Sequence, residues 1–456
     1  MRKKLLLIFM AVLAVVGLTA CKKPEDKPTP GEGDRIDFSQ TLGKKVEITV
    51  WLDDEGGEYA KALIEAFNQT PEGKDITVIF RHEGTVESRD RLKTYGPTGG
   101  GADVFQFPHD HIAPAILEDL VFALPESTRE LVESRSHEIG AQIAKVQYDD
   151  TTNTYGPGSE AVERLFAMPT SVESIGLYYN KKLINEEDVP KTMEDLIAKA
   201  KVWNEQLIPG GSGQTNLQAG RPYFTTSNHW ADSYFMQGFY SAHGYQPFGE
   251  NLDDKNNVGF ESAEMKSALT WFRDELKPIV SGTGPRQPDG QGGNFEAGLI
   301  PLIIAGPWNI EAYLKASDAI DLGVAPMPTI AGKASNTYAG AIMTAVYKYS
   351  KNRNAAVKFV EFLNSDKAME LLYQYKGKLP ALKPELLSNI QGVSQDKLLM
   401  GMSEQLKTSI PMPTIPEIEH YWGPGENMLK ALWADGDIDT ITKAAQESYE
   451  ALAKIN

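Results

Sequence analysis

The stretch AMPTSVESIGLYYN, residues 167–180, decides how this chain folds. Its β-branched and aromatic residues favour an extended strand, and one carboxylate, Glu173, stands in the middle of the apolar run. A carboxylate inside a strand is costly unless something pairs with it. Two interpretations stay open: Glu173 caps a loop or meets an arginine, or the strand crosses between two lobes and Glu173 faces their cleft.

The N-terminal residues have the features of a leader and a tether. Basic residues precede an apolar run, 5–18, which is too short and wrongly flanked for a membrane span. The run ends in LTAC, which resembles a bacterial lipobox, and Cys21 is the only cysteine in the chain. We therefore expect a signal peptide over 1–20, a lipid on Cys21 and a flexible tether over 21–34. The alternative is an ordinary secretory signal with an incidental cysteine.

Composition narrows the possible partners. The formal charge is −17, and removing 1–20 takes away three basic residues and no acid, which leaves −20. This strongly acidic charge argues against nucleic acid as a partner, because phosphate-binding faces are basic. It suits a soluble extracellular surface. One cysteine excludes an intramolecular disulfide, and the remaining length is enough for two lobes.

The order of the first elements predicts a mainly parallel sheet. Residues 46–51 alternate as a strand, a helix with an apolar stripe follows over 60–67, and further strands are expected at 76–80 and 103–107. Strands that alternate with helices form parallel sheets with helices on both faces. Ligands of such sheets bind beyond the carboxyl ends of the strands.

The segment after the third strand, His109-Asp110-His111, stands where such a site is expected. Its spacing matches no helical histidine pair and no third ligand cluster is near, so we expect no metal. Asp110 is interpreted as an acceptor for ligand hydroxyls, or as the N-cap of the next helix, and both roles stay open.

Aromatic residues next to carboxylates recur in the loops. This set is Trp51 with Glu55, Phe107 with Asp110, Glu173, Tyr223 and Phe224, Trp308, and Tyr421 with Trp422. One face of a sugar ring is a patch of C–H groups that stacks on an aromatic ring, and carboxylates accept pairs of its hydroxyls. The set therefore describes a carbohydrate site. Core anchoring of the loops is the plainer explanation, and paired carboxylates also describe a glycosidase.

At this point the chain resembles the extracellular solute-binding proteins, family 1, of bacterial sugar ABC transporters, and most closely the maltose/maltodextrin-binding proteins. The similarity runs over nearly all of 45–456 and is densest in 46–54, 101–124, 168–183, 222–224, 295–308 and 412–422. The resemblance implies an α/β fold of the periplasmic-binding-protein type, with two lobes, hinge crossovers and a ligand cleft between them. It places the first lobe at 35–172 and 338–405, and the second at 173–337 and 406–456.

The resemblance also implies the ligand-binding residues. They are Asp54 or Glu55, Phe107, Asp110, His111, Glu173, Arg221, Tyr223, Phe224, Trp308, Met412, Tyr421 and Trp422. Arg221 stands where the maltodextrin branch usually has a glutamate, and His111 replaces a basic residue that is commonly arginine. Gly423 replaces an aromatic residue, which would open that end of the groove to longer ligands.

The function that the resemblance implies is a monomeric, lipid-anchored receptor for an α-linked glucose oligosaccharide on the outer face of the membrane or in the periplasm. The lobes would close on the ligand and present it to a permease and its ATPase. We expect no catalysis and no cofactor, and the chain lacks the ATPase phosphate-binding motif. The alternatives are a receptor of the same fold for another ligand, a secreted glycosidase, and a surface adhesin.

Overall fold

The computed structural model describes residues 45–149, 154–155, 161–210, 213–281, 289–316 and 318–454. The predicted signal peptide, Cys21 and the tether lie outside the described residues. In the part of the chain that is described, no helix combines the length and the apolar character needed to cross a bilayer.

The first lobe is built on a sheet of six strands. β1 (Val46–Leu52) pairs in parallel with β2 (Ile76–His82) and with β3 (Val104–Pro108), which confirms the parallel order expected from the sequence. β12 (Tyr338–Val346) runs antiparallel to β3 and to β7 (Met168–Ser174). The sheet therefore combines segments from opposite halves of the chain.

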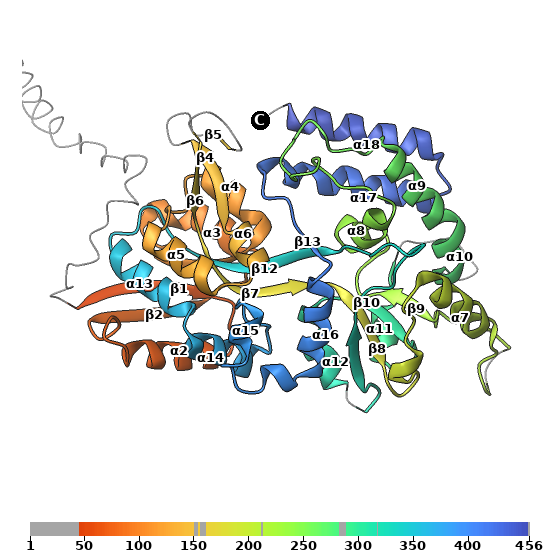
Figure 1. Cartoon of the computed structure of the whole chain (residues 1–456), viewed down its shortest axis with the longest axis horizontal. Coiled ribbons are helices and arrows are strands. Elements are labelled where there is room, and N and C mark those ends of the chain that lie inside the picture. Colours follow the sequence, from red (N-terminus) through yellow and green to blue (C-terminus); the bar gives the residue numbers. More distant parts are fainter. Residues whose placement is uncertain are drawn as a thin grey trace, which may run out of the picture.

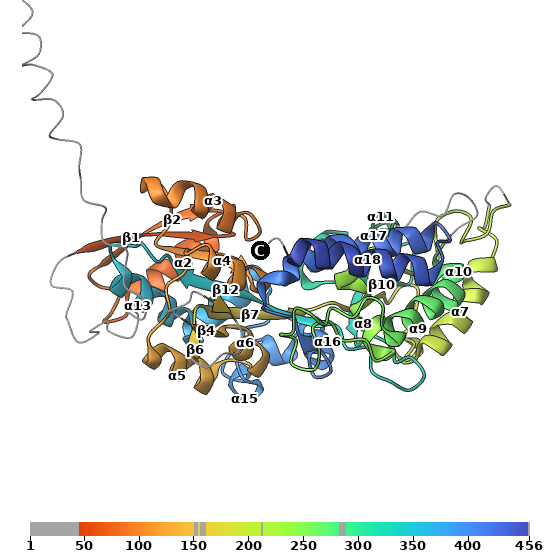
Figure 2. The ribbon, with the colours of Figure 1, turned by 90° about the horizontal axis from the view of Figure 1, so that it is seen from above.

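Helices cover both faces of this sheet (Figure 2). They are α2 (Glu58–Asn68), α3 (Ser88–Tyr95), α4 (Ile112–Leu117), α5 (Glu126–Arg135), α6 (Glu138–Ile143), α13 (Arg353–Leu363), α14 (Asp366–Lys376) and α15 (Pro384–Leu387). The helix α16 (Lys397–Leu406) packs between the lobes, on β7 of this sheet and on β11 (Leu322–Ala325) of the second lobe. A small sheet of β4 (Lys145–Asp149), β5 (Thr154–Tyr155) and β6 (Val162–Leu165) lies at the upper edge of the lobe in Figure 1.

The second lobe has its own sheet, in the order β11 (Leu322–Ala325), β8 (Gly176–Asn180), β10 (Leu302–Ala305) and β9 (Phe224–Thr226). Its helices are α7 (Met193–Glu205), α8 (Ser233–Ala242), α9 (Ala263–Trp271), α10 (Lys277–Val280), α11 (Gly292–Glu296), α12 (Ile310–Lys315), α17 (Glu419–Trp433) and α18 (Ile438–Ala453). The hydroxyl of Thr192 accepts from the Asp195 amide at 3.1 Å and caps α7, as the spacing predicts.

Three clusters of buried apolar residues form the cores, one in the first lobe and two in the second. The cluster of the first lobe comes from 48–172 and 339–406, and the two of the second lobe come from 175–330, 398 and 415–453. The stretch 167–180 is shared between the two lobes, because β7 belongs to the first sheet and β8 to the second. The stretch is therefore extended and runs from one lobe to the other (Figure 1).

The last crossing lies later in the chain than 406. β13 (Ile410–Pro411) pairs in parallel with the start of β12, so hydrogen bonding ties it to the sheet of the first lobe. Ile415 is the first residue after β13 whose side chain packs in the core of the second lobe. Strand pairing, which the sequence pattern does not reveal, holds this segment to the first lobe.

Buried hydroxyls join the crossing segments at the hinge. The Ser174 hydroxyl lies 2.6 Å from that of Thr337, and it donates to the Tyr338 carbonyl at 2.9 Å. The Ser409 hydroxyl bonds to both Ser174 and Thr337. The ends of β7, β12 and β13 are thus held together at one point, where a change of angle between the lobes would be absorbed.

Replacing Ser174 by alanine is expected to destabilise the protein by about 1–3 kcal/mol, because the buried Thr337 hydroxyl and Tyr338 carbonyl lose a partner. Urea unfolding followed by circular dichroism measures the change. Ser388→Ala is the control, because Ser388 is exposed at the end of a short helix. Equal midpoints for the two variants would contradict a structural role for the hinge hydroxyls.

Candidate functional site

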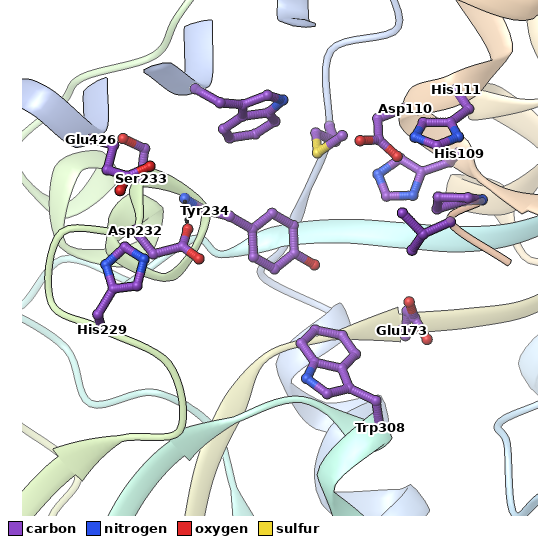
Figure 3. A pocket seen from close by; sticks show the side chains of 14 residues that line it. His109, Asp110, His111, Glu173, His229, Asp232, Ser233, Tyr234, Trp308 and Glu426 are labelled. Atoms are coloured by element: carbon purple, nitrogen blue, oxygen red, sulfur yellow. Dashed lines mark hydrogen bonds between the residues drawn. The ribbon is translucent and has the colours of Figure 1, made fainter. Parts of the chain in front are cut away.

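A cleft of about 400 Å³ opens between the two lobes beside the hinge. Its volume falls within the range of roughly 300–1,000 Å³ that is typical of small-molecule sites. It is lined by Val86, Pro108, His109, Asp110, His111, Glu173, His229, Asp232, Ser233, Tyr234, Trp308, Met412, Trp422 and Glu426. Figure 3 shows these side chains converging from both lobes.

The wall formed by the first lobe lies at the carboxyl end of β3, where a parallel sheet is expected to bind its ligand. β3 ends at Pro108, and a single turn, η4 (His109–His111), carries His109, Asp110 and His111 to the cleft. Glu173, from the crossing strand β7, completes this wall (Figure 3).

The wall formed by the second lobe follows strand β9. The loop after β9 brings His229 to the cleft, and α8 begins directly after Asp232. The Asp232 carboxylate accepts from the amide of Tyr234 at 2.8 Å, which caps the helix. This cap fixes the first turn of α8 and with it the position of the Tyr234 side chain.

Tyr234 is the centre of an aromatic group. Its ring centroid lies 5.9 Å from Tyr338, 6.4 Å from Trp308 and 6.5 Å from Trp422. Trp308 is 48 % exposed, which leaves ring surface open to a ligand. In Figure 3 Trp308 lies near Tyr234 and Glu173 in the cleft. The arrangement provides apolar surfaces for the flat faces of sugar rings.

Burial keeps several polar groups of the cleft neutral. It raises the pKa of the Tyr234 hydroxyl well above its usual value, and the charges of Glu173 and Asp110 add to the rise. It lowers the pKa of His109 and of His111 against the opposing effect of nearby carboxylates. The cleft therefore offers neutral donors beside carboxylate acceptors, and no lysine or arginine is among the residues that line it.

An ion pair joins the lobes next to the cleft. Nη1 of Arg89, on α3, donates to the Glu419 carboxylate at the start of α17 over 2.7 Å. Glu118 lies 3.6 Å from the same guanidinium. Arg89, whose charge helps to lower the pKa of His111, is thus already paired with acidic side chains.

Acidification is expected to destabilise the protein in part through His109. A histidine of the unfolded chain has a pKa of about 6.5, and the folded value is lower, so below that pH the unfolded state binds a proton that the folded state does not. The free energy of unfolding should fall as the pH drops from about 7 to about 5. Urea titrations across this range should show a shallower fall for His109→Gln; an equal slope in both proteins would contradict a neutral buried His109.

Six of the predicted site residues line the cleft. They are Asp110, His111, Glu173, Trp308, Met412 and Trp422. The interpretation of Glu173 as a residue facing the cleft agrees with its position in Figure 3. The alternative role of Asp110 as a helix N-cap is wrong, because α4 starts after His111 and no side chain caps it.

The predicted contacts from Arg221, Tyr223 and Phe224 do not line the cleft. Phe224 begins β9, and the cleft lies beyond the opposite end of that strand. Tyr223 packs against Trp203, and Phe224 is fully buried. Trp203 also donates to the Arg221 carbonyl at 2.9 Å, which holds this segment against α7. Arg221, Tyr223 and Phe224 therefore lie at the end of β9 that is away from the cleft.

Other predicted contacts belong to the framework of the lobes. Phe107 and Tyr421 are fully buried, because Phe107 packs on Phe105 and Tyr421 stacks on Phe260 at 5.1 Å. Asp54 is buried and accepts from the Ala60 amide at 2.9 Å, so its carboxylate serves the start of α2. Glu55 is exposed and does not line the cleft.

Sequence analysis placed Pro108 and His109 in the segment expected at the site but gave them no ligand contact, and it missed Val86, His229, Asp232, Ser233, Tyr234 and Glu426. The sequence does carry a signal for the residues at the start of α8, which include Asp232, Ser233 and Tyr234. Asp232 precedes an apolar helical stripe and follows a strand, and the start of a helix after a strand is where an α/β lobe presents its ligand contacts.

Within the described ranges, no three histidine, cysteine, aspartate or glutamate side chains are grouped to hold a metal ion.

The fold and the cleft define a two-lobe α/β binding protein. The family described as bacterial extracellular solute-binding protein matches residues 53–370, so the chain belongs to that family. This match confirms the resemblance and the fold class drawn from the sequence.

Relatives cover almost the whole chain. A galactooligosaccharide-binding protein of Bacillus subtilis (strain 168) is 26% identical over 98% of this chain and 96% of its own length. A maltooligosaccharide ABC transporter solute-binding lipoprotein of Streptococcus pneumoniae (TIGR4) is 26% identical over 92% of this chain and 89% of its own. A cyclo/maltodextrin-binding protein complexed with maltotetraose has a TM-score of 0.72 at 24% identity, covering 90% of this chain and 98% of its own.

Proposed function

We propose that this chain is the lipid-anchored binding component of a sugar ABC importer and holds a maltodextrin-type oligosaccharide between its lobes. The observation that carries this proposal is the cleft itself, which is lined by the aromatic rings of Tyr234, Trp308 and Trp422 and by the carboxylates of Asp110 and Glu173. Figure 3 shows Tyr234 and Trp308 on the side toward these two carboxylates. Rings that stack on sugar faces and carboxylates that accept hydroxyls are the two contacts that a neutral oligosaccharide needs.

The cleft supports binding without reaction. Asp110 and Glu173 lie on the wall of the first lobe, and Asp232, on the wall of the second, is engaged by backbone amides as a helix cap. A glycosidase needs two free carboxyl groups that flank one bond. Two relatives are named as maltooligosaccharide ABC transporter solute-binding lipoproteins, and two others as a galactooligosaccharide-binding and a maltodextrin-binding protein. We propose that the chain catalyses no reaction, needs no cofactor, acts as a monomer and delivers its ligand to a permease at the outer face of the membrane, anchored through Cys21.

A galactooligosaccharide is the second candidate ligand, because a relative of that name aligns with nearly the whole chain. Galactose and glucose units differ in the direction of one hydroxyl. The aromatic contacts would serve both, and the discrimination would fall to the carboxylates and to neighbouring donors.

Calorimetric titration of residues 22–456 with maltotriose, a galactotriose and xylotriose tests the proposal. We expect saturable binding of maltotriose, tighter than that of the other two trisaccharides by about tenfold or more, which is about 1.4 kcal/mol. The sugar should be recovered intact after prolonged incubation. Preferred binding of the galactotriose would select the second candidate, and cleavage of any of the three would overturn the assignment as a binding protein.

A further inference from the structure

His109 occupies an unusual place on the cleft wall, since it is only 5 % exposed and its ring bonds to the backbone of a hinge strand. Nδ1 of His109 accepts from the amide of Ala341, in β12, at 3.2 Å. A neutral imidazole has one donor and one acceptor nitrogen. Because Nδ1 is the acceptor, the proton of the neutral ring is on Nε2.

This Nε2–H group is left without an acceptor. Nε2 is buried and has no hydrogen-bond partner among the described residues. A buried donor that stays unpaired is unfavourable. Nε2 is closed to solvent in this structure, so a side chain that packs next to the ring is better placed to supply the acceptor than an incoming sugar oxygen.

The ring reaches from the end of β3 over β12, the strand that pairs with β7. His109 follows the end of β3, and its ring covers Gly340 of β12, where an added Cβ would lie 2.4 Å from Cε1 and 2.8 Å from Nδ1. Gly340 is paired with Glu173 of β7. Directly opposite residues of antiparallel strands share a face, with Cβ atoms about 4.5–5.5 Å apart. His109 therefore fills the place of a side chain beside Glu173.

The carboxylates of Asp110 and, with a smaller effect, Glu173 oppose the lowering of the His109 pKa by burial, so both act on the ring electrostatically. Asp110 is the next residue in the same turn, whereas Glu173 extends from the strand on the far side of Gly340. Since Nδ1 is occupied by Ala341, the free edge of the ring is the one that carries Nε2. Figure 3 shows His109 and Glu173 on the same wall of the cleft.

We propose that His109 is a positioning residue: when the Glu173 side chain turns toward the ring, Nε2–H of His109 donates to its carboxylate and holds it as the acceptor for ligand hydroxyls. This proposal rests on the proposed function of the cleft. The contacts run from the Ala341 amide, through both ring nitrogens, to Glu173 and then to the sugar. No proton is transferred. Because Ala341 lies in a strand that enters the hinge, ligand contact and hinge are joined through one ring.

The first test needs no sugar. Nitrogen-15 spectra of the histidine side chains in residues 22–456 should show Nε2 of His109 protonated and Nδ1 as the acceptor. Glu173→Gln should shift the Nε2–H resonance of His109, while Asp110→Asn leaves it nearly in place. A proton on Nδ1, or a shift caused by Asp110→Asn alone, would overturn the proposal.

The second test uses two substitutions of His109, each of which keeps a hydrogen-bonding group near one of the two ring nitrogens. His109→Asn keeps an oxygen near the Nδ1 position for the Ala341 amide but removes the distal donor. His109→Gln places an N–H near the Nε2 position. We expect His109→Asn to lower maltotriose affinity by about tenfold or more, and His109→Gln to recover most of that loss. His243→Asn is the control, because His243 bonds to Ser267 away from the cleft.

A double-mutant cycle separates positioning from general disruption. In a Glu173→Gln background, His109→Asn should cause little further loss, since its partner is already altered. Equal losses for the asparagine and glutamine variants, or full additivity with Glu173→Gln, would overturn the proposal. If the unmodified protein binds no maltotriose, the proposed function fails, and the nitrogen-15 test still decides the role of His109.

Discussion

Replacing Trp308 and Trp422 together by alanine is expected to abolish oligosaccharide binding. Both rings line the cleft, and both lie within 6.5 Å of the Tyr234 ring. Truncating a tryptophan at the centre of an interface commonly costs about 2 kcal/mol or more, which is roughly 30-fold in affinity. Each single substitution should weaken maltotriose binding by about this factor, and calorimetry of both variants measures it.

The fold should survive the loss of Trp308, because its ring is 48 % exposed and belongs to neither core. Trp271→Phe is the matched control, since Trp271 stacks on Phe239 outside the cleft and phenylalanine keeps that contact. Its affinity should equal that of the unmodified protein. A double tryptophan variant that binds maltotriose normally would show that the sugar sits elsewhere.

Replacing Gly340 by alanine is expected to destabilise the protein by about 1–3 kcal/mol, the usual effect of overpacking. The added methyl group would lie 2.4 Å from Cε1 of His109, in a strand position where alanine would ordinarily be favourable. The ring must then leave its place beside Glu173. Maltotriose affinity should fall along with stability, as measured by urea unfolding and calorimetry.

Gly293 offers a control for the same exchange. It lies in α11, is exposed, and a Cβ there would meet no atom within 4 Å. Gly293→Ala should leave stability equal or slightly higher. Adding His109→Ala to Gly340→Ala should relieve the clash and recover part of the lost stability, but not the affinity. Equal stability of the two single glycine variants would contradict the packing of His109 on β12.

The sequence predicts the framework of the fold because periodicity and element order follow from local residues. The extended stretch 167–180 and the Thr192 cap are each determined within a few residues, the parallel pairs of β1 follow from the alternation of strands and helices, and the structure has all three. The residue at which the chain finally leaves the first lobe is harder to predict from the sequence. β13 belongs to that lobe only through two residue pairs with β12, and its two residues carry no periodicity of their own.

The site is predicted less completely than the fold, because whether a side chain faces the cleft depends on where the neighbouring strand ends. Phe224 and Tyr234 look alike as aromatic residues, but one is buried at the start of β9 and the other begins the helix after it. The role of His109 also depends on a distant glycine, Gly340, whose missing side chain makes room for the ring. Only tertiary structure brings such residues together.

The central claim is that the two lobes close on an oligosaccharide, and one distance measures it. The described body has no cysteine, because Cys21 is the only one in the chain, so Thr94→Cys and Asn427→Cys can carry a specific pair of spin labels. Both residues are exposed, one on α3 of the first lobe and the other on α17 of the second. Pulsed electron resonance should show a shorter and narrower distance distribution when maltotriose is added, and no change with xylotriose. An unchanged distribution at a maltotriose concentration that calorimetry shows to be saturating would contradict the account.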